Sequence, residues 1–255
     1  MSTLRARCPD CRTMTAVAVG DEYQCHSCGR EYAAGLVRVP RAWGTGGEAM
    51  AAAAHLPLPY PEAAVIEEAS LEDQIAAQIR NLPVRPLVLG GCCCSHVGVI
   101  RGLADRRGGR LAVAWVDAHG DLNTPNSSPS GNAWGMPLRM AIDDGAVAPA
   151  DVALVGARSL DPPELDYLAR TGIDDDLGRA LEGCDRVYVA FDCDVLQPGE
   201  LAVFMPEPGG PTIPEAESLL RDIAVRCPIA GLGLTGLHED AEPAVLVRLA
   251  AAAGL

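Results

Sequence analysis

The chain has 255 residues, a mass of 26.6 kDa and 49% apolar residues, enough for one α/β domain with a sizeable core and a small appendage. Its net charge of −14 and pI near 4.7 argue against nucleic acid or an anionic membrane as a default partner, because both repel an acidic surface. The sequence contains neither the roughly 18 unbroken apolar residues of a spanning helix nor an apolar segment after residues 1–5, which predicts a cytoplasmic protein.

Two C-x2-C pairs, separated by thirteen residues, lie near the start of the chain. Two such pairs complete a tetrahedral four-thiolate site without an open position, which is typical of structural zinc. The residues between them predict a hairpin, and residues 29–32 predict a return strand, so zinc would supply much of the folding free energy of this zinc-ribbon module. The expected zinc ligands are Cys8, Cys11, Cys25 and Cys28.

Recognition of nucleic acid is the alternative role for this module, and the acidic chain disfavours it. Its basis is a set of arginines that makes this end the only basic part of the chain: Arg5, Arg7, Arg12, Arg30, Arg38 and Arg41. His26, inside the second C-x2-C pair, is expected to be an exposed turn residue rather than a ligand.

Glycines in residues 43–47 and prolines in residues 57–61 indicate a linker and loop around a short alanine-rich stretch. The predicted division is a zinc-ribbon module at 1–42, a linker at 43–62 and an α/β domain at 63–255. Ser70 is the expected N-cap of a packing helix, because Asp73 follows three residues later and the next apolar residues have helical spacing.

An apolar run from residue 113 ends in Asp117, His119 and Asp121, which predicts a buried parallel strand with polar residues at its carboxyl end. In an extended segment these three side chains share one face. The sequence places no basic residue nearby to neutralise the two carboxylates, so a divalent cation is the natural counter-charge.

Residues 187–198 repeat this pattern, with Asp192 and Asp194 on one face of a second strand end. Five hard ligands exceed what one metal needs, and bridging carboxylates hold two cations roughly 3.5 to 4 Å apart in two-metal sites. Asp-rich turns that cap helices are the simpler alternative, but a cap does not require a His between two Asp residues.

The segments 117–121 (DAHGD), 130–137 (SGNAWGMP), 191–194 (FDCD) and the turn Gly90-Gly91 have the order and spacing of the arginase/agmatinase (ureohydrolase) family, which this sequence resembles from residue 87 onward. Members of that family hydrolyse guanidino groups at a binuclear manganese centre. The resemblance implies a three-layer arginase-like fold with a central, mostly parallel sheet, here preceded by the zinc ribbon. It also implies a homo-oligomer that acts on a small guanidino amino acid, with two divalent cations, Mn²⁺ first.

The first departure from the family follows the Gly90-Gly91 turn, where ureohydrolases have an Asp and then a metal-binding His. Here Cys92 and Cys93 occupy those positions. A Cys93 thiolate would favour Zn²⁺ or Fe²⁺ over Mn²⁺; a weakly held first metal, or burial of Cys93 as a small apolar residue, stays open. His96 is expected to cap or pack. The implied metal ligands are Cys93, Asp117, His119, Asp121, Asp192 and Asp194.

The second departure is Trp134, which stands where arginases have a His that shuttles protons to the leaving amine. An indole has no titratable proton near neutral pH. Near the last strand end, where the family places an acid that grips the guanidinium, His238 and Glu239 are the catalytic candidates. Asp240 and Glu242 stay open beside Glu239, which we favour.

The resemblance also places substrate-binding residues. Asn123, Ser130 and Asn132 match the positions that hold the α-carboxylate in arginases, and Asp161, supported by Glu164, matches the site of the α-amino group. Amide and hydroxyl donors opposite a carboxylate are the chemistry that a zwitterion needs. Asn and Ser are also common turn residues, so that alternative stays open.

The predicted reaction is attack on the amidine carbon by a water whose pKa two cations lower, with Asp121 as a catalytic ligand and urea or a substituted urea as product. Arginine, N-hydroxyarginine, formiminoglutamate and a guanidino-bearing biosynthetic intermediate all fit these anchors. If Cys93 ligates the first metal and Trp134 replaces the shuttle, N-hydroxy-L-arginine should be a better substrate than L-arginine, because its leaving group needs less help. Two alternatives remain. The centre has degenerated into a binding or regulatory site, or Cys93 is a nucleophile that attacks the guanidino carbon.

Overall fold

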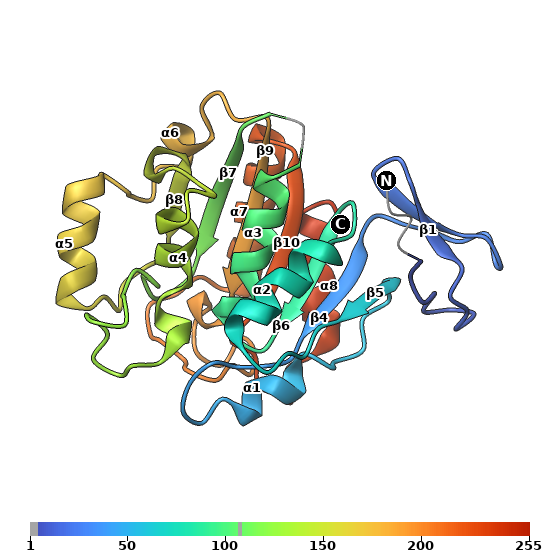
Figure 1. The fold of residues 1–255 in the computed structure, drawn as a ribbon, viewed down its shortest axis with the longest axis horizontal. Helices are drawn as coiled ribbons and strands as arrows, with labels where there is room; N and C mark the ends of the chain where they lie inside the picture. The colour runs from blue at the N-terminus through green and yellow to red at the C-terminus, as the bar shows by residue number, and fades with distance from the viewer. Residues whose placement is uncertain (1–4, 107–108) are drawn as a thin grey trace.

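The computed structural model describes residues 5–106 and 109–255 and contains two sheets (Figure 1). All neighbouring strands of the larger sheet are parallel. In spatial order they are β5 (Glu62–Val65), β4 (Gly35–Val39), β6 (Pro86–Gly90), β10 (Ile229–Thr235), β9 (Arg186–Asp192), β7 (Leu111–Val116) and β8 (Val152–Val155). The strands are near-continuous apolar runs, as expected where helices cover both faces of a parallel sheet.

Two apolar cores, one on each face, fill the space between the sheet and its helices. One face packs against α2 (Leu71–Arg80), α3 (Val97–Ala104), α4 (Pro137–Asp143) and α5 (Pro162–Thr171). The other packs against α6 (Leu177–Leu181), α7 (Ile213–Arg226) and α8 (Pro243–Ala252). The predicted three-layer α/β fold is therefore confirmed. The short α1 (Glu48–Ala53) lies at the edge where the strands end (Figure 1).

Local signals in the sequence account for several element boundaries. Ser70 caps α2, as predicted, because its hydroxyl accepts a hydrogen bond from the Asp73 backbone N–H at 3.1 Å. Short 3-10 turns follow three of the strands that build the site or its rim. They are η1 (Cys93–His96), η2 (Ala133–Gly135) and η4 (Cys193–Val195), while η3 (Pro149–Asp151) leads into β8.

The smaller sheet consists of the hairpin β1 (Ala16–Val19) and β2 (Glu22–Cys25) and the return strand β3 (Glu31–Tyr32). It lies beside the β5 edge of the large sheet, where Arg7 and Glu62 exchange backbone hydrogen bonds of 2.8 and 3.0 Å. The ring of Tyr23, which is 1% exposed, packs against Gly35, where a Cβ would lie 2.9 Å from the ring. This module is therefore joined to the main domain by both backbone pairing and packing.

The structure differs from the predicted division at residue 42. Residues 35–39, which the sequence interpretation put in the ribbon module, form β4 inside the large sheet, paired with β5 and β6. The reason is that all five of these residues are buried and that the apolar ones among them belong to the two main cores. The segment 43–62, predicted as a linker, contains α1 and the first residue of β5.

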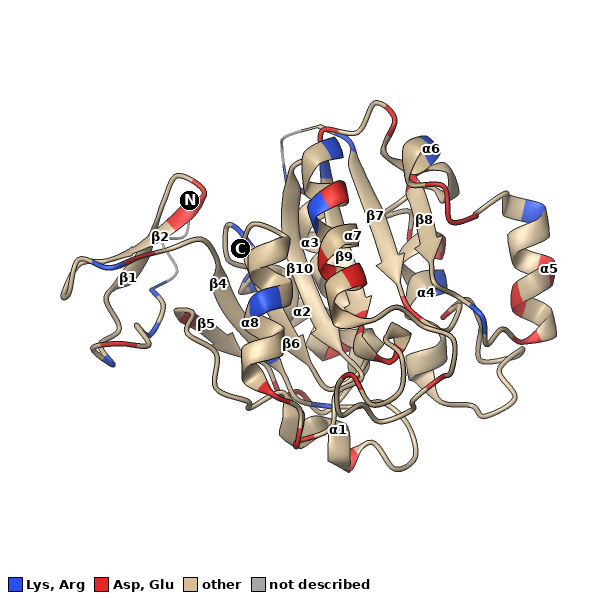
Figure 2. Ribbon diagram, turned by 180° about the vertical axis from the view of Figure 1, so that it is seen from behind, with Lys and Arg blue, Asp and Glu red and all other residues tan. Residues whose placement is uncertain are grey.

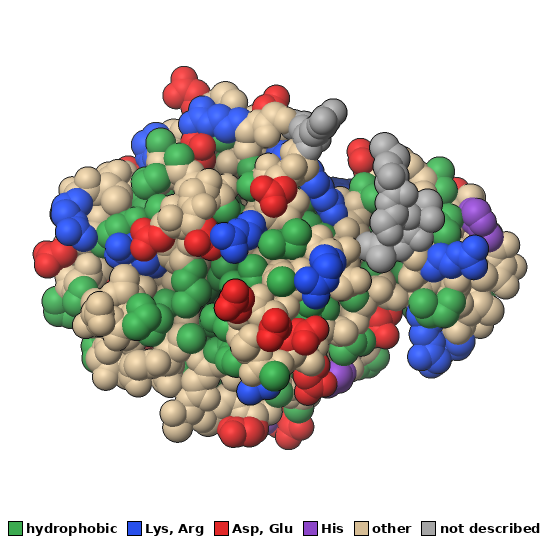
Figure 3. All heavy atoms as spheres, viewed as in Figure 1, with side chains coloured by type: hydrophobic (Ala, Val, Ile, Leu, Met, Phe, Trp, Pro, Cys, Tyr) green, Lys and Arg blue, Asp and Glu red, His purple; other side chains and the backbone are tan. Residues whose placement is uncertain are grey.

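The charges of the small module balance. Arg38 is 7% exposed and pairs with Glu62 at 2.6 Å, and the Arg41 guanidinium lies over the Trp43 ring. Within residues 5–34 the remaining four arginines face four acidic residues, so the net charge of that segment is zero. Side chains of both signs also alternate over the molecule (Figures 2 and 3). Acidic residues therefore match the arginines in number within this segment, and His26 is exposed, as expected.

None of the helices in the described segments 5–106 and 109–255 has the length and apolar character needed to cross a membrane.

Candidate metal centre and substrate cavity

The carboxyl ends of β6, β7, β9 and β10 meet at one edge of the sheet, which is where ligands bind in open α/β sheets. A cavity of about 210 Å³ lies there. Its polar lining comes from the residues that follow these strands and from the start of α5: Cys93, Asp117, His119, Asp121, Asn123, Ser128, Ser130, Ser159, Asp161, Glu164, Asp192 and Asp194. Its apolar lining includes Met50, Leu160, Trp134, Phe204 and Met205.

Two groups of potential metal ligands overlap in this cavity. The ligand atoms of Cys93, Asp117 and Asp192 lie within 4.8 Å of one another, and so do those of Asp117, His119 and Asp194. Because the two groups share Asp117, the arrangement is the one that a pair of cations bridged by a carboxylate requires.

Asp121 supplies an independent test of whether cations fit. Its Oδ2 atom is buried and has no hydrogen-bond partner among the described residues, a costly state for a carboxylate oxygen. Its backbone has φ +53, a strained value for a residue other than Gly, so the chain holds this carboxylate at the cavity against a local preference. The donor set and the unpaired oxygen therefore fit a binuclear site.

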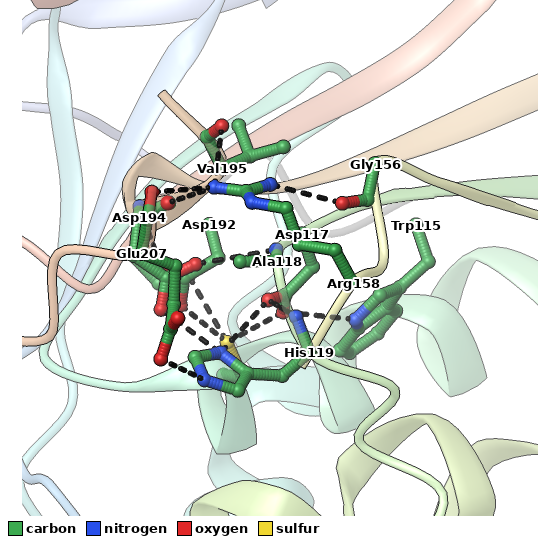
Figure 4. A network of polar contacts seen from close by, with 12 residues as sticks. Trp115, Asp117, Ala118, His119, Gly156, Arg158, Asp192, Asp194, Val195 and Glu207 are labelled. Atoms are coloured by element: carbon green, nitrogen blue, oxygen red, sulfur yellow. Dashed lines mark hydrogen bonds and ion pairs between the residues drawn. The ribbon is translucent and has the colours of Figure 1, made fainter. Parts of the chain in front are cut away.

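The closest contacts show which atoms face the site. Cys93 Sγ lies 2.7 Å from Asp192 Oδ2 and 3.3 Å from Thr235 Oγ1. His119 Nδ1 lies 3.1 Å from Asp194 Oδ2 and 3.4 Å from Asp117 Oδ1 (Figure 4). Nδ1 is therefore the nitrogen with which His119 would bind a cation.

Burial and mutual repulsion dominate the electrostatics of the cluster. Burial, together with the charge of Asp117, raises the pKa of Asp192 to about 6, and burial with the charges of Asp192 and Asp117 raises the pKa of Asp194 to about 8. Burial and the same carboxylates raise the pKa of the Cys93 thiol well above its usual range. Burial alone would lower the pKa of His119, but hydrogen bonds to Asp117 and Asp194 outweigh it and raise that pKa to about 12. Without cations, this cluster retains protons.

Four residues that support the site were not predicted from the sequence. Trp115 Nε1 donates to Asp117 Oδ2 at 3.1 Å, and the Ala118 N–H donates to Asp194 Oδ1 at 3.3 Å. Arg158 donates to five backbone carbonyls, of residues 156, 194, 195, 207 and 208, and Glu207 Oε1 lies 3.7 Å from His119 Nε2 (Figure 4). Such partners orient ligands and tune their basicity. The sequence around Glu207 predicts only a turn, and nothing in it distinguishes Glu207 from other surface acids.

The residues predicted to hold a zwitterion only partly face the cavity. Asp161 and Ser130 line it, whereas Asn132 does not, because its Oδ1 accepts from the Thr45 N–H at 3.0 Å. Asn123 donates to Asp161 Oδ2 at 2.8 Å and accepts from Ser127. Asn123 therefore positions Asp161.

Glu164 lines the cavity but is engaged by the backbone. Its two oxygens accept from the Leu122 and Asp161 N–H groups, both at 2.9 Å, and it completes the capping box of α5. It therefore ties the loop after Asp121 to the start of α5.

Trp134 lines the cavity and packs against Phe204, with ring centroids 6.0 Å apart. Gly44 lies so close that a Cβ there would overlap the Trp134 ring. The Ala133 N–H also donates to the Trp43 carbonyl at 2.9 Å. The glycine-rich segment predicted as a linker is therefore packed against η2 at the rim of the cavity.

The structure does not support the role assigned to Glu239. After Thr235 the chain turns at Gly236, with φ +69, and Glu239 is exposed while His238 Nδ1 lies 3.3 Å from Asp240 Oδ2. Among the described residues of this segment, Gly236 is the one that lines the cavity, and a Cβ there would overlap the Asp192 carboxylate. The direction of this turn, which spacing alone does not reveal, carries Glu239 away from the cavity.

The four predicted zinc ligands of the small module also come together. Their sulfur atoms lie within 4.8 Å of one another, and all ten cysteines are free. The Sγ atoms of Cys8 and Cys28 are 3.7 Å apart, and those of Cys11 and Cys25 are 3.5 Å apart. Both distances are close to the S–S separation of about 3.8 Å that four Zn–S bonds of about 2.3 Å give in a tetrahedron. A hydrogen bond with Thr15 lowers the pKa of Cys25 to about 5. This cluster fits one structural metal ion.

The fold and the cavity define an α/β protein with a binuclear metal-type centre at the ends of its parallel strands. The model of the arginase family matches residues 47–237. The chain therefore belongs to the arginase family.

Individual relatives agree. The chain is 36% identical over 143 residues to an arginase of Bacillus subtilis, a match that covers 45% of this chain and 48% of that protein. It is 31% identical over 189 residues to an arginase of Bacillus caldovelox, a match that covers 61% of this chain and 63% of that protein. Each match therefore spans about half to two thirds of the relative's length. The structure of Bacillus caldovelox arginase is similar to this one with a TM-score of 0.68 and 25% identity, over 86% of this chain and 97% of that one.

Proposed function

We propose that this protein hydrolyses the amidine C–N bond of a guanidino amino acid and releases urea or a substituted urea. The observation that carries the proposal is that the two ligand groups that share Asp117 lie in the same cavity as Asp161 and Ser130, which suit an amino-acid substrate. The arginase relatives support the same class of reaction.

Two divalent cations would be held by Cys93, Asp117, His119, Asp121, Asp192 and Asp194, and they would supply Lewis-acid activation of water. The oxygen-rich set favours Mn²⁺, while a Cys93 thiolate shifts preference toward Zn²⁺ or Fe²⁺. Asp121 has one oxygen without a protein partner, and this atom can accept a hydrogen bond from water in the cavity. We also propose that the four ribbon cysteines hold one structural Zn²⁺.

The zwitterionic end of the substrate would be bound by neutral donors and one acid. Asp161, held by Asn123, suits the ammonium group, and the hydroxyls of Ser128 and Ser130 suit the carboxylate. No Arg among the described residues lines the cavity, so carboxylate binding there depends on hydroxyl and amide donors.

The guanidino end of the cavity favours a weakly basic group. Trp134 offers no proton near neutral pH, and Gly236 contributes no acid from the last strand end. Apart from the metal ligands, the carboxylates among the described residues that line the cavity are Asp161, which we assign to the ammonium group, and Glu164, whose oxygens accept from backbone N–H groups, so a protonated guanidinium has no carboxylate of its own there. An N-hydroxyguanidine is less basic. When the C–N bond to its hydroxylated nitrogen breaks, hydroxylamine leaves and needs less general-acid assistance than an alkylamine, and the amino acid keeps the substituted urea. N-hydroxy-L-arginine is the substrate that we favour.

The test compares kcat/KM for N-hydroxy-L-arginine and L-arginine at neutral pH, with Mn²⁺, Zn²⁺ and Fe²⁺ supplied in turn. We expect a preference for the N-hydroxy substrate of about 10² to 10⁴, the usual contribution of the missing general acid. The Trp134→His variant should narrow this gap. Equal or greater efficiency on L-arginine in the parent would contradict the leaving-group explanation.

Two further outcomes would replace the proposal. Ligand binding without turnover, in a protein that contains one zinc per chain and no other metal, would identify a binding or regulatory protein. A covalent substrate adduct on Cys93, detected by mass spectrometry, would identify a cysteine nucleophile instead.

A further inference from the structure

A buried hydrogen-bond chain connects β9 to the Cys93 corner of the metal-type cluster. His96 lies at the end of η1, with Nδ1 2.9 Å from the Tyr188 hydroxyl and Nε2 3.2 Å from Thr235 Oγ1. Thr235 Oγ1 in turn lies 3.2 Å from Asp192 Oδ2 and 3.3 Å from Cys93 Sγ. The side chains of His96, Tyr188 and Thr235 are all 0% exposed. Polar groups from η1, β9 and β10 therefore form a continuous chain that ends at the predicted ligands Cys93 and Asp192.

The surrounding residues make room for this chain and fix it. Gly233 lies in β10 two residues before Thr235, on the same face, and a Cβ there would overlap both the Tyr188 hydroxyl and the His96 ring. The Trp115 ring packs edge-on against His96 at 5.2 Å with an interplanar angle of 81°. The His96 ring is thus held by packing as well as by its two hydrogen bonds.

The direction of the chain follows from its protonation states. Burial raises the pKa of Tyr188 well above its usual range and lowers the pKa of His96 to about 3, so both are neutral near pH 7. Among the described residues, His96 is the hydrogen-bond partner of the Tyr188 hydroxyl, which therefore donates to Nδ1, because an unpaired buried hydroxyl is costly. A neutral imidazole then carries its proton on Nε2 and donates to Thr235 Oγ1. The Thr235 hydroxyl hydrogen remains free for Asp192 or Cys93.

We propose that Tyr188, His96 and Thr235 form a one-directional hydrogen-bond relay that positions Cys93 and Asp192 as adjacent metal ligands. The proposal rests on the proposed function, which makes both residues ligands. The Cys93 thiol donates to Asp192 Oδ2 at 2.7 Å, and this hydrogen bond is lost when both residues bind cations; the Thr235 hydroxyl is then a donor within reach of both ligand atoms. Thr235 is then a positioning residue for these two ligands.

The test uses Co²⁺, whose bond to a thiolate gives a charge-transfer absorption band. Because the ribbon thiolates give a band of their own, each spectrum is taken as the difference from the same variant with Cys93→Ser added. Thr235→Val keeps the shape and removes the hydroxyl, so we expect Co²⁺ affinity at the strand-end site to fall about 10- to 100-fold and the Cys93 band to move to longer wavelength. Thr235→Ser keeps the hydroxyl and should resemble the parent in both.

Other outcomes separate the relay from packing and from the proposed function. If Thr235→Ser binds Co²⁺ as weakly as Thr235→Val, or more weakly, Thr235 acts by packing and the relay is wrong. Tyr188→Phe should move the Cys93 band in the same direction by a smaller amount. An unmoved band would show that Tyr188 is not part of the relay and that the direction inferred from it is wrong. A parent that binds two cations and hydrolyses substrate without a Cys93 band overturns the relay alone. A parent that binds no cation beyond the ribbon overturns both proposals.

Discussion

The protein places cysteines in two metal-type clusters with opposite designs. In the small module, three cysteines lie in or next to turns and Cys25 ends β2, and the four sulfur atoms form a cluster of identical ligand atoms. At the strand ends, one thiol joins buried carboxylates and a His in a cavity that also contains substrate-type residues. A closed set of identical ligands suits a metal that holds a fold together, whereas a mixed set open to a cavity suits a metal that meets substrate.

The largest effect is expected at the strand-end carboxylates. We expect Asp121→Ala and Asp192→Ala each to lower kcat/KM by more than about 100-fold, because even the outer partners of metal ligands are worth 10- to 100-fold. The measurement combines kinetics with metal content per chain, in which the strand-end cations fall and the ribbon metal stays. Asp166→Ala, an exposed acid on α5, is the matched control. A metal-loaded Asp121→Ala, Asp192→Ala double variant with the parent rate would show that the site is wrongly assigned.

The reverse experiment removes the ribbon ligand Cys11. We expect Cys11→Ser to lose about one zinc per chain and to make residues 5–34 sensitive to protease, because a module this small depends on its metal for folding. The strand-end cations should remain. Cys184→Ser, outside both clusters, controls for loss of a thiol. Simultaneous loss of the strand-end cations would contradict the separation of the two clusters.

Much of this organisation could be predicted from the sequence, because it depends on local patterns. The apolar runs that end in Asp117 and Asp192 specify parallel strands, and parallel strands carry their carboxyl ends to one edge. The ribbon follows from its cysteine spacing. In contrast, the glycines of residues 43–47 place the predicted boundary after β4, and only the pairing of β4 with β5 and β6 shows that this strand belongs to the large sheet.

The remainder of the site depends on contacts between distant segments. Glu239 was favoured on spacing, but the positive φ of Gly236 turns the chain away from the cavity. Glu207 and Arg158 act on segments that lie next to each other only in the folded chain. His96 packs in the core, as the sequence predicts, but its hydrogen bond to Thr235 joins residues that are 139 positions apart in the chain. No periodicity or motif reports a contact of that kind.

Cys93 is the cysteine that belongs to the strand-end ligand groups, so its replacement tests what a thiolate contributes there. We expect Cys93→His to shift metal preference toward Mn²⁺, because imidazole replaces a soft thiolate in an oxygen-rich set. The measurement is the ratio of Mn²⁺ to Zn²⁺ affinity at the strand-end site, for which we expect a rise of about tenfold or more, within the range that ligand changes produce. Cys94→Ala, buried next to it and outside the ligand groups, is the control. An unchanged ratio would remove Cys93 from the ligands.

The last expected effect is a fall in stability with rising pH that the buried carboxyls of the strand-end cluster produce. In the protein freed of strand-end cations, burial and neighbouring charge raise the folded-state pKa of Asp192 to about 6 and of Asp194 to about 8, against about 3.9 for an unfolded Asp. The folded state therefore binds more protons than the unfolded state. The resulting stabilisation is full below about pH 4 and is lost as the pH rises through about 6 and then 8.

The Tm of the protein without strand-end cations should therefore fall as the pH rises through this window. The measurement is Tm from pH 5 to 8.5, with and without Mn²⁺, while the ribbon keeps its zinc. Mn²⁺ should flatten the profile, because the carboxylates then stay ionised as ligands. Asp194→Asn should flatten the metal-free profile between pH 6 and 8, since it removes the group that titrates there. A metal-free profile that rises with pH in the parent, or an unchanged slope in Asp194→Asn, would show that these buried carboxyls do not carry the charge assigned to them.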